Sequence, residues 1–134
     1  MKSVKHHLRR LPAFVLTAVA LLLTAWLTLS PRPLGDAEPV LFPGADKCAH
    51  AILFGILTIA MMADRQRSRD WQKVSTPFAI LSVALATGIG AGIEFLQRAM
   101  AIGRTFEEAD ILADFGGSIV AALLYLFMQP RWSE

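Results

Sequence analysis

Apolar residues occur in four long runs that are separated by short polar segments. The runs cover residues 11–29, 48–63, 77–97 and 109–128. A helix needs about 20 residues to cross a hydrocarbon core about 30 Å thick, and the second run has only 16. Polar residues that precede this run must therefore enter the membrane with it. The pattern predicts an all-α, polytopic membrane protein, a single domain over residues 1–134 with four transmembrane helices at about 11–29, 46–63, 77–97 and 109–128 and short loops.

The first run follows the basic segment 2–10, as the apolar core of a signal peptide would. Such a core is usually about 7–15 residues long and is followed by small residues at a cleavage site. The first run has 19 residues, and no such site follows it. We therefore predict an uncleaved first transmembrane helix, which ends before Pro31 because proline lacks an amide donor.

Composition supports a membrane protein and excludes several other classes. Hydrophobic residues make up 54% of the 134 residues, charged residues only 18%, and the mean hydropathy is +0.49. Soluble domains average about 25% charged residues, and disordered chains are much poorer in apolar residues. The single cysteine, Cys48, excludes a disulfide scaffold.

Charged residues are divided unequally between the two sides of the predicted bundle. The side with both termini and the loop 64–76 carries nine basic and three acidic residues, a net charge of +6. The other side carries four basic and eight acidic residues, a net charge of −4. Basic residues in short loops favour the cytoplasm, so both termini are predicted to be cytoplasmic. Topology and anionic lipids account for the basic segments, and no nucleic-acid partner is predicted.

Three of the four predicted helices carry ionisable residues at their outer end only. Asp46 and His50 are four residues apart at the start of the second helix, so they share a face and His50 has a carboxylate partner. Glu94 lies near the end of the third helix, and Asp110 and Asp114 open the fourth. Ionisable groups inside membrane helices are costly and are usually functional. We predict a polar pocket at the outer leaflet with these ligand-binding residues: Asp46, Lys47, His50, Glu94, Gln97, Arg104, Asp110 and Asp114.

These residues resemble the motifs of the VanZ-like family in order and in spacing. The family's motif D-K-x-x-H matches residues 46–50, and its motif E-x-x-Q matches residues 94–97. Its third motif, G-R-x-x-x-x-x-D-x-x-x-N with a glycine three positions later, matches residues 103–117. The resemblance covers about residues 46–121 and departs at Asp114, where the family usually has asparagine. An asparagine there can donate a hydrogen bond, whereas an ionised Asp114 can only accept one.

The resemblance implies a small, multi-pass protein of the bacterial inner membrane with a role in the cell envelope. The family is named for a protein that gives resistance to teicoplanin. Glycopeptide resistance is therefore one process that the resemblance suggests, and it does not establish resistance for this chain.

The mixed charges of the predicted pocket leave its ligand open. Lys47 and Arg104 argue against a site for hard cations, so no dedicated metal site is predicted. Arg104 would suit a phosphate group or one of the acids. A transition-metal site remains an alternative, and its ligands would be Asp46, His50, Glu94 and Asp110.

Catalysis is a second open question. His50, Glu94 and Asp110 are the candidate catalytic residues, because an imidazole or carboxyl group can act as a general acid or base. No nucleophile motif or glycine-rich phosphate loop indicates a particular reaction. The sequence therefore does not decide whether the protein is an enzyme, and it leaves the identity of any cofactor open.

Glycines are expected to let the helices pack closely beneath the pocket. Gly88 and Gly92 are four residues apart on the third helix and form a face of small residues. Gly116 and Gly117 are expected to do the same on the fourth helix, below Asp114. Close packing there would fix the polar groups in position.

Three functions fit these observations. The leading hypothesis is recognition or modification of a cell-envelope component, in particular a lipid-linked one. The second is a structural or accessory subunit that docks onto a membrane-protein partner. The third is translocation of small ions or lipids. Membrane lipids are expected partners in all three cases.

Overall fold

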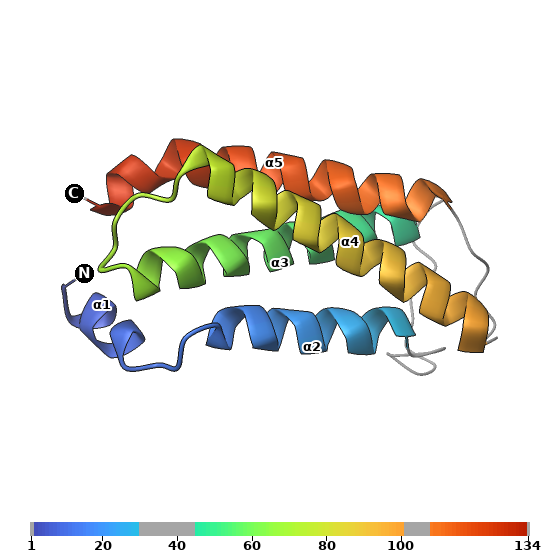
Figure 1. The fold of residues 1–134 in the computed structure, drawn as a ribbon, viewed down its shortest axis with the longest axis horizontal. Coiled ribbons are helices and arrows are strands. Elements are labelled where there is room, and N and C mark those ends of the chain that lie inside the picture. The colour runs from blue at the N-terminus through green and yellow to red at the C-terminus, as the bar shows by residue number, and fades with distance from the viewer. Residues whose placement is uncertain (1, 30–44, 101–107, 134) are drawn as a thin grey trace.

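The computed structural model describes residues 2–29, 45–100 and 108–133. These residues form helices and contain no strand, which confirms the all-α fold class. Four helices run along the long axis of the molecule, and α1 is a short helix at one end (Figure 1). The helices are α1 (Lys2–Arg9), α2 (Val15–Leu29), α3 (Ala45–Ser68), α4 (Thr76–Met100) and α5 (Glu108–Ser133).

Three of the helices are long and apolar enough to cross a membrane. Their apolar spans are Lys47–Ser68, Thr76–Ala99 and Glu108–Gln129, and Val15–Leu29 is a shorter apolar helix. Large apolar side chains are exposed on the outer faces, among them Leu22, Leu112 and Phe127. So many exposed large apolar side chains are typical of helices in contact with lipid. The structure is therefore consistent with a four-helix membrane protein.

The helices differ from the predicted ranges mainly at the end of the molecule that holds α1 and the last turn of α5, which we call the terminal end. The first long helix begins at Val15 rather than near residue 11, because Phe14 has a φ of 64° and interrupts the helical path after Pro12. Helix α3 continues to Ser68, five residues beyond the predicted end. The opposite end of the bundle is called the far end below.

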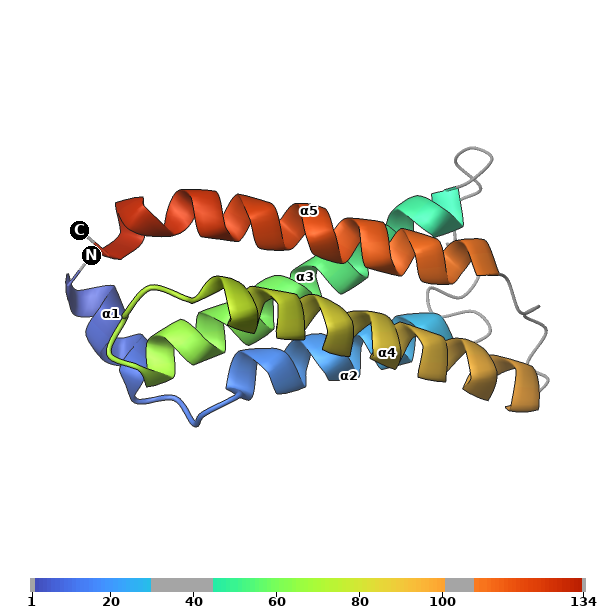
Figure 2. The same ribbon diagram turned by 45° about the horizontal axis from the view of Figure 1, so that its top comes forward.

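Helix α3 crosses the bundle diagonally and contacts all the other helices (Figure 2). Its first turns lie beside the start of α5 at the far end, and its last turns lie beside α1 and α2 at the terminal end (Figures 1 and 2). Phe54 and Leu57 of α3 are fully buried with Ala86 of α4. Met62 of α3 is buried with Tyr125 of α5. Helix α3 thereby connects the two ends of the molecule.

Small residues allow α3 and α5 to approach closely one turn below the predicted pocket. A Cβ atom on Gly117 would lie only 2.1 Å from the carbonyl oxygen of Ala51. Gly55 faces the same contact, since a Cβ atom on it would lie 3.3 Å from the carbonyl oxygen of Gly117. A side chain at Gly117 would require movement of a helix backbone, and one at Gly55 would make a tight contact.

Three of the other predicted glycine contacts are wrong. A Cβ atom on Gly88, Gly92 or Gly116 would meet nothing within 4 Å among the described residues. On α4 the glycine in close contact is Gly90, which lies between the two predicted positions. The sequence contains three alternate glycines there, and spacing alone did not reveal which face of α4 turns inward.

A buried ion pair joins α3 to α2 at the terminal end. Asp64 and Arg67 of α3 are almost completely buried, and Arg67 Nη2 lies 2.9 Å from Asp64 Oδ1. The other carboxylate oxygen of Asp64 accepts hydrogen bonds of 2.8 Å from both the backbone N–H and the hydroxyl of Thr17. Asp64 thus satisfies donors in the first turn of α2, where a negative charge is also favoured by the helix dipole.

Arg67 also holds the segment between α1 and α2. Its guanidinium group donates to the carbonyl oxygens of Leu8, Leu11 and Pro12 at 2.7–2.9 Å. These carbonyl groups belong to the end of α1 and the segment after it, where the helical hydrogen bonds stop. The sequence predicts a loop at residues 64–76 whose charges set the orientation, and this packing role of Asp64 and Arg67 is not visible in it.

Candidate functional site

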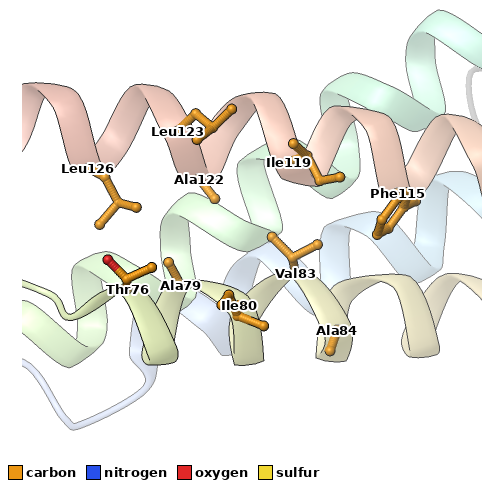
Figure 3. A pocket seen from close by; sticks show the side chains of 10 residues that line it. All are labelled: Thr76, Ala79, Ile80, Val83, Ala84, Phe115, Ile119, Ala122, Leu123 and Leu126. Atoms are coloured by element: carbon orange, nitrogen blue, oxygen red, sulfur yellow. The ribbon is translucent and has the colours of Figure 1, made fainter.

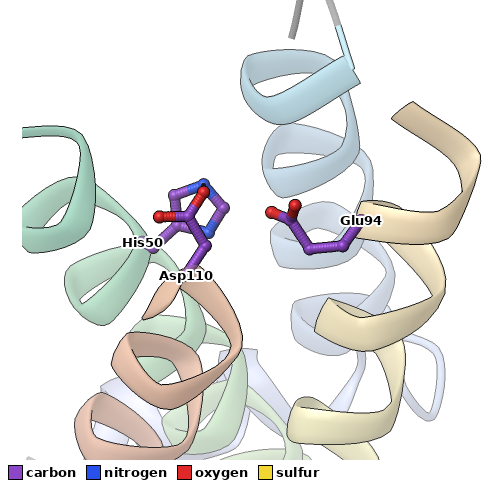
Figure 4. A group of neighbouring side chains, drawn as sticks. All are labelled: His50, Glu94 and Asp110. Atoms are coloured by element: carbon purple, nitrogen blue, oxygen red, sulfur yellow. Dashed lines mark ion pairs between the residues drawn. The ribbon is translucent and has the colours of Figure 1, made fainter. Parts of the chain in front are cut away.

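Four ionisable side chains from three helices meet at the far end. His50 comes from α3, Glu94 from α4, and Asp110 and Asp114 from α5. Their exposed fractions are 5%, 0%, 8% and 0% respectively. Glu94 faces His50 and Asp110 from the opposite helix (Figure 4). We call these four residues the far-end cluster.

The His50 ring lies between the two aspartates of α5. Its Nδ1 atom is 2.9 Å from Asp114 Oδ1, and its Nε2 atom is 3.9 Å from Asp110 Oδ2. The ring also stacks on Phe54, one turn along α3, with ring centroids 6.0 Å apart. When Asp114 is ionised its carboxylate can only accept, so the hydrogen bond then runs from Nδ1–H to Asp114 Oδ1, and Nε2 is the ring nitrogen nearer Asp110.

Asp114 is therefore the described partner of His50. The sequence predicted Asp46 as this partner from their spacing of four residues, but the side chain of Asp46 lies outside the described part of the structure. Asp114 could not be paired with His50 by sequence spacing, because the two are 64 residues apart. Their contact depends on the close approach of α3 and α5.

Lys47 lies at the rim of the cluster. Its Nζ atom is 3.7 Å from Asp110 Oδ1, and its side chain is 38% exposed. The two oxygens of Asp110 thus face different groups, since Oδ1 faces Lys47 and Oδ2 faces His50. Lys47 and His50 share a face of α3 because they are three residues apart.

The cluster contains a set of ligand atoms with spacing suited to a metal ion. One ligand atom each from His50, Glu94 and Asp110 lies within 4.8 Å of the other two. Asp114 Oδ2 is buried and accepts no hydrogen bond from the described residues, whereas Asp110 Oδ1 has the Lys47 ammonium 3.7 Å away. Buried carboxylate oxygens are usually satisfied by hydrogen bonds or by a cation.

Gly90 makes room for the cluster on the α4 side. A Cβ atom at this position would lie 2.3 Å from Asp114 Oδ2. The carboxylate of Asp114 therefore packs directly against the backbone of α4. Gly90 was not among the predicted site residues. The alternate glycines at positions 88, 90 and 92 were the sequence signal that a neighbouring group packs closely against this part of α4.

The other predicted site residues have separate roles or lie outside the described structure. Gln97 is buried and donates a hydrogen bond to the carbonyl oxygen of Thr28 at the end of α2. It connects α4 to α2, and this contact accounts for its burial without a ligand. Arg104 lies outside the described residues.

An apolar groove lies between α4 and α5 and leads toward the cluster. Its volume is about 360 Å³, and its lining is aliphatic and aromatic apart from Thr76 (Figure 3). The groove extends from Thr76 near the terminal end to Phe115, which follows Asp114 directly in the sequence. Its apolar lining suits a hydrocarbon chain.

The charges of the described site residues favour a cation or a hydrogen-bond donor as ligand. Three carboxylates surround His50, and Lys47 is the basic residue that contacts one of them. A phosphate group would be repelled by the carboxylates. Sugar hydroxyls, amines and metal ions can all interact with carboxylate oxygens.

A family model described as VanZ/LLP1 matches residues 5–129, nearly the whole chain. Neither the curated proteins nor the solved structures give a match to the chain. The match includes all the residues of the far-end cluster. It also includes the first long helix, α2, which lies outside the motif resemblance over about residues 46–121.

Proposed function

The chain belongs to the VanZ/LLP1 family. We propose that it recognises or modifies a polar, lipid-linked component of the cell envelope, and that the far-end cluster binds the polar part of this component. In this proposal the protein crosses the bacterial inner membrane several times. The observation that carries the proposal is the burial of four ionisable side chains from three helices in one place. Such groups are costly within a membrane and are usually retained for function.

Helix packing is a weaker explanation for this cluster. Polar contacts between membrane helices contribute on average only about 0.6 kcal/mol each. The small residues Gly55, Gly117 and Gly90 already allow close contact between α3, α5 and α4. Several acids in one buried place also repel one another, which opposes packing. A ligand that interacts with these acids would offset this cost.

The charge distribution supports an outward-facing site. Nine of the 13 basic residues belong to the terminal end or to the segments beside it. Under the positive-inside rule this end faces the cytoplasm, and the far-end cluster then lies in the outer leaflet. Components of the cell envelope are accessible from that side.

The groove between α4 and α5 supports a ligand that carries a hydrocarbon chain. It is apolar, and its far-end limit at Phe115 lies next to the cluster residue Asp114. A lipid-linked molecule bound there would place its chain in the groove and its polar group beside the acids. Sugar hydroxyls suit the acids better than a phosphate does, and a phosphate would bind nearer Lys47 at the rim.

The proposal is tested by the lipids that remain bound to the purified protein. We expect mass spectrometry of gently extracted wild-type protein to show one enriched class of envelope lipid. The variant His50→Ala should retain about tenfold less, because a lost hydrogen bond or two costs about 1.5 kcal/mol. Ser118→Ala, on the same face of α5 one turn below Asp114, is the matched control and should retain wild-type amounts.

Two results would contradict the proposal. Equal lipid retention by wild type and by a folded His50→Ala variant would show that the cluster does not bind the lipid. A second protein that copurifies in a fixed ratio, with no enriched lipid, would support an accessory subunit instead.

A further inference from the structure

We propose that the far-end cluster is a binding site for a divalent transition-metal ion, with His50, Glu94 and Asp110 as its ligands. The ion would give the proposed envelope site a positively charged centre, so this inference deepens the proposed function and rests on it for its biological role. It departs from the expectation, drawn from the sequence, that the pocket has no dedicated metal site.

The ligand atoms have the spacing of a slightly open metal site. The three groups each offer an atom that lies within 4.8 Å of the others, and His50 Nε2 and Asp110 Oδ2 are 3.9 Å apart. Metal bonds to imidazole nitrogen and carboxylate oxygen are about 2.0–2.2 Å long, which places ligand atoms about 3.3–3.6 Å apart around a tetrahedral ion. Small rotations of the side chains would close the site around an ion.

Asp114 supports the role of His50 as a ligand. Metal-binding histidines usually donate the hydrogen of their second ring nitrogen to a carboxylate, which fixes the ring and directs the other nitrogen to the ion. His50 Nδ1 lies 2.9 Å from Asp114 Oδ1, and Nε2 is directed toward Asp110. This is the arrangement expected of a histidine that binds metal through Nε2. Asp114 would then be a positioning residue, because it acts on the ion through His50.

The charges of the described side chains match a divalent ion. Glu94, Asp110 and Asp114 bring three negative charges, Lys47 brings one positive charge, and a metal-binding His50 is neutral. The resulting charge of −2 would be neutralised by one divalent cation. Neutralisation is strongly favoured where the surroundings are apolar.

Lys47 does not occupy the metal-facing side of Asp110. The sequence suggested that a lysine so near the acids would disfavour a cation. In the structure Lys47 Nζ faces Asp110 Oδ1, whereas Oδ2 of the same carboxylate faces His50. Asp110 can therefore contact Lys47 and an ion at the same time through different oxygens.

The donor set favours a transition metal over magnesium or calcium. Magnesium and calcium prefer sites made entirely of oxygen ligands, whereas imidazole suits zinc and its neighbours. The three side chains leave at least one position of the ion open. A hydroxyl group or water molecule can occupy such a position, which would place the ion in direct contact with a polar ligand.

The inference is tested by titrating Zn²⁺, and in parallel Mn²⁺, into the full-length protein in detergent after treatment with a chelator. His6→Gln, His7→Gln and Cys48→Ala are introduced into every sample, so that other nitrogen and sulfur donors do not contribute. We expect one bound ion per chain. His50→Ala and Glu94→Gln should each weaken binding by at least about 100-fold, and Asp114→Leu by about 10–100-fold.

Ser118→Ala is the matched control and should bind as the parent does. Glu94→Gln keeps the shape of the side chain, and circular dichroism of each variant confirms folding. Absence of binding of both ions overturns the inference, as does unchanged affinity in folded His50→Ala and Glu94→Gln variants. Lipid retention that depends on His50 in a protein that binds neither ion would overturn the metal site and leave the proposed function standing.

Discussion

The variant Arg67→Met is expected to lower the free energy of unfolding by about 3–5 kcal/mol, because it leaves the carboxylate of Asp64 buried without its cation. It also removes the hydrogen bonds to the carbonyl groups of Leu8, Leu11 and Pro12. Methionine fills a similar volume, so lost packing contributes little. The measurement is unfolding of the purified protein in a mild detergent, followed by circular dichroism.

Arg69→Met is the control for the loss of one positive charge. Arg69 is exposed at the end of the same helical region, and its replacement should change stability by less than about 0.5 kcal/mol. If Arg67→Met and Arg69→Met are equally stable, the buried ion pair does not hold the terminal end together. The double variant Asp64→Asn, Arg67→Met should recover part of the lost stability, because it no longer buries an unpaired charge.

Gly117→Ala is expected to destabilise the contact between α3 and α5 by about 1–3 kcal/mol, the usual cost of overpacking. The added methyl group would lie 2.1 Å from the carbonyl oxygen and 2.6 Å from the Cα atom of Ala51. Both are backbone atoms of a helix, so neither can move aside alone. The two helices must therefore separate, and thermal unfolding in detergent measures the loss.

Gly116→Ala provides a matched control at the neighbouring position. An added Cβ atom there meets no described atom within 4 Å. This variant should be as stable as the wild type or more stable by up to about 1 kcal/mol, since alanine favours a helix more than glycine does. Equal stability of the two variants would contradict the close approach of α3 and α5.

Gly117 also helps to position the far-end cluster. Gly117 lies three residues after Asp114, and its contact at Ala51 follows directly after His50. Separation of the helices would therefore lengthen the 2.9 Å contact between His50 and Asp114. Gly117→Ala should weaken ion binding as well as folding, whereas Gly116→Ala should weaken neither.

The apolar runs and the composition were sufficient to predict the fold class. Four apolar runs correspond to the four long helices, because burial in lipid makes each run apolar on nearly all sides. The helix ends at the terminal end were less predictable. Asp64 and Arg67 were interpreted as loop charges, whereas the structure places both in α3, in contact with Thr17 and Pro12.

The candidate site was predicted in part. The expectation that ionisable residues of three helices meet at one end follows from the alternating directions of the helices, and the structure brings His50, Glu94, Asp110 and Asp114 together. The pairing within the site depends on helix rotation and on distant residues. Spacing along one helix suggested Asp46 as a partner of His50; the side chain of Asp46 lies outside the described structure, and the described partner is Asp114, 64 residues away.

The contacts of Gln97 and Gly90 also could not be predicted without the tertiary structure. Gln97 shares a face of α4 with Glu94, yet it contacts the carbonyl oxygen of Thr28 on α2. Gly90 borders Asp114, whereas an added Cβ atom on Gly88 or Gly92 would meet no described atom within 4 Å. Both follow from the rotation of α4 about its axis, which a nearly uniformly apolar helix does not reveal in its sequence.

The central claim is that the far-end cluster holds a ligand and is more than a packing contact between helices. An experimental density map of the protein in a bilayer of its native lipids tests this most directly. We predict density that belongs to no protein atom among His50, Glu94 and Asp110, within bonding distance of all three side chains. A map in which these side chains contact only one another and their protein neighbours, with no density between them, would contradict the claim.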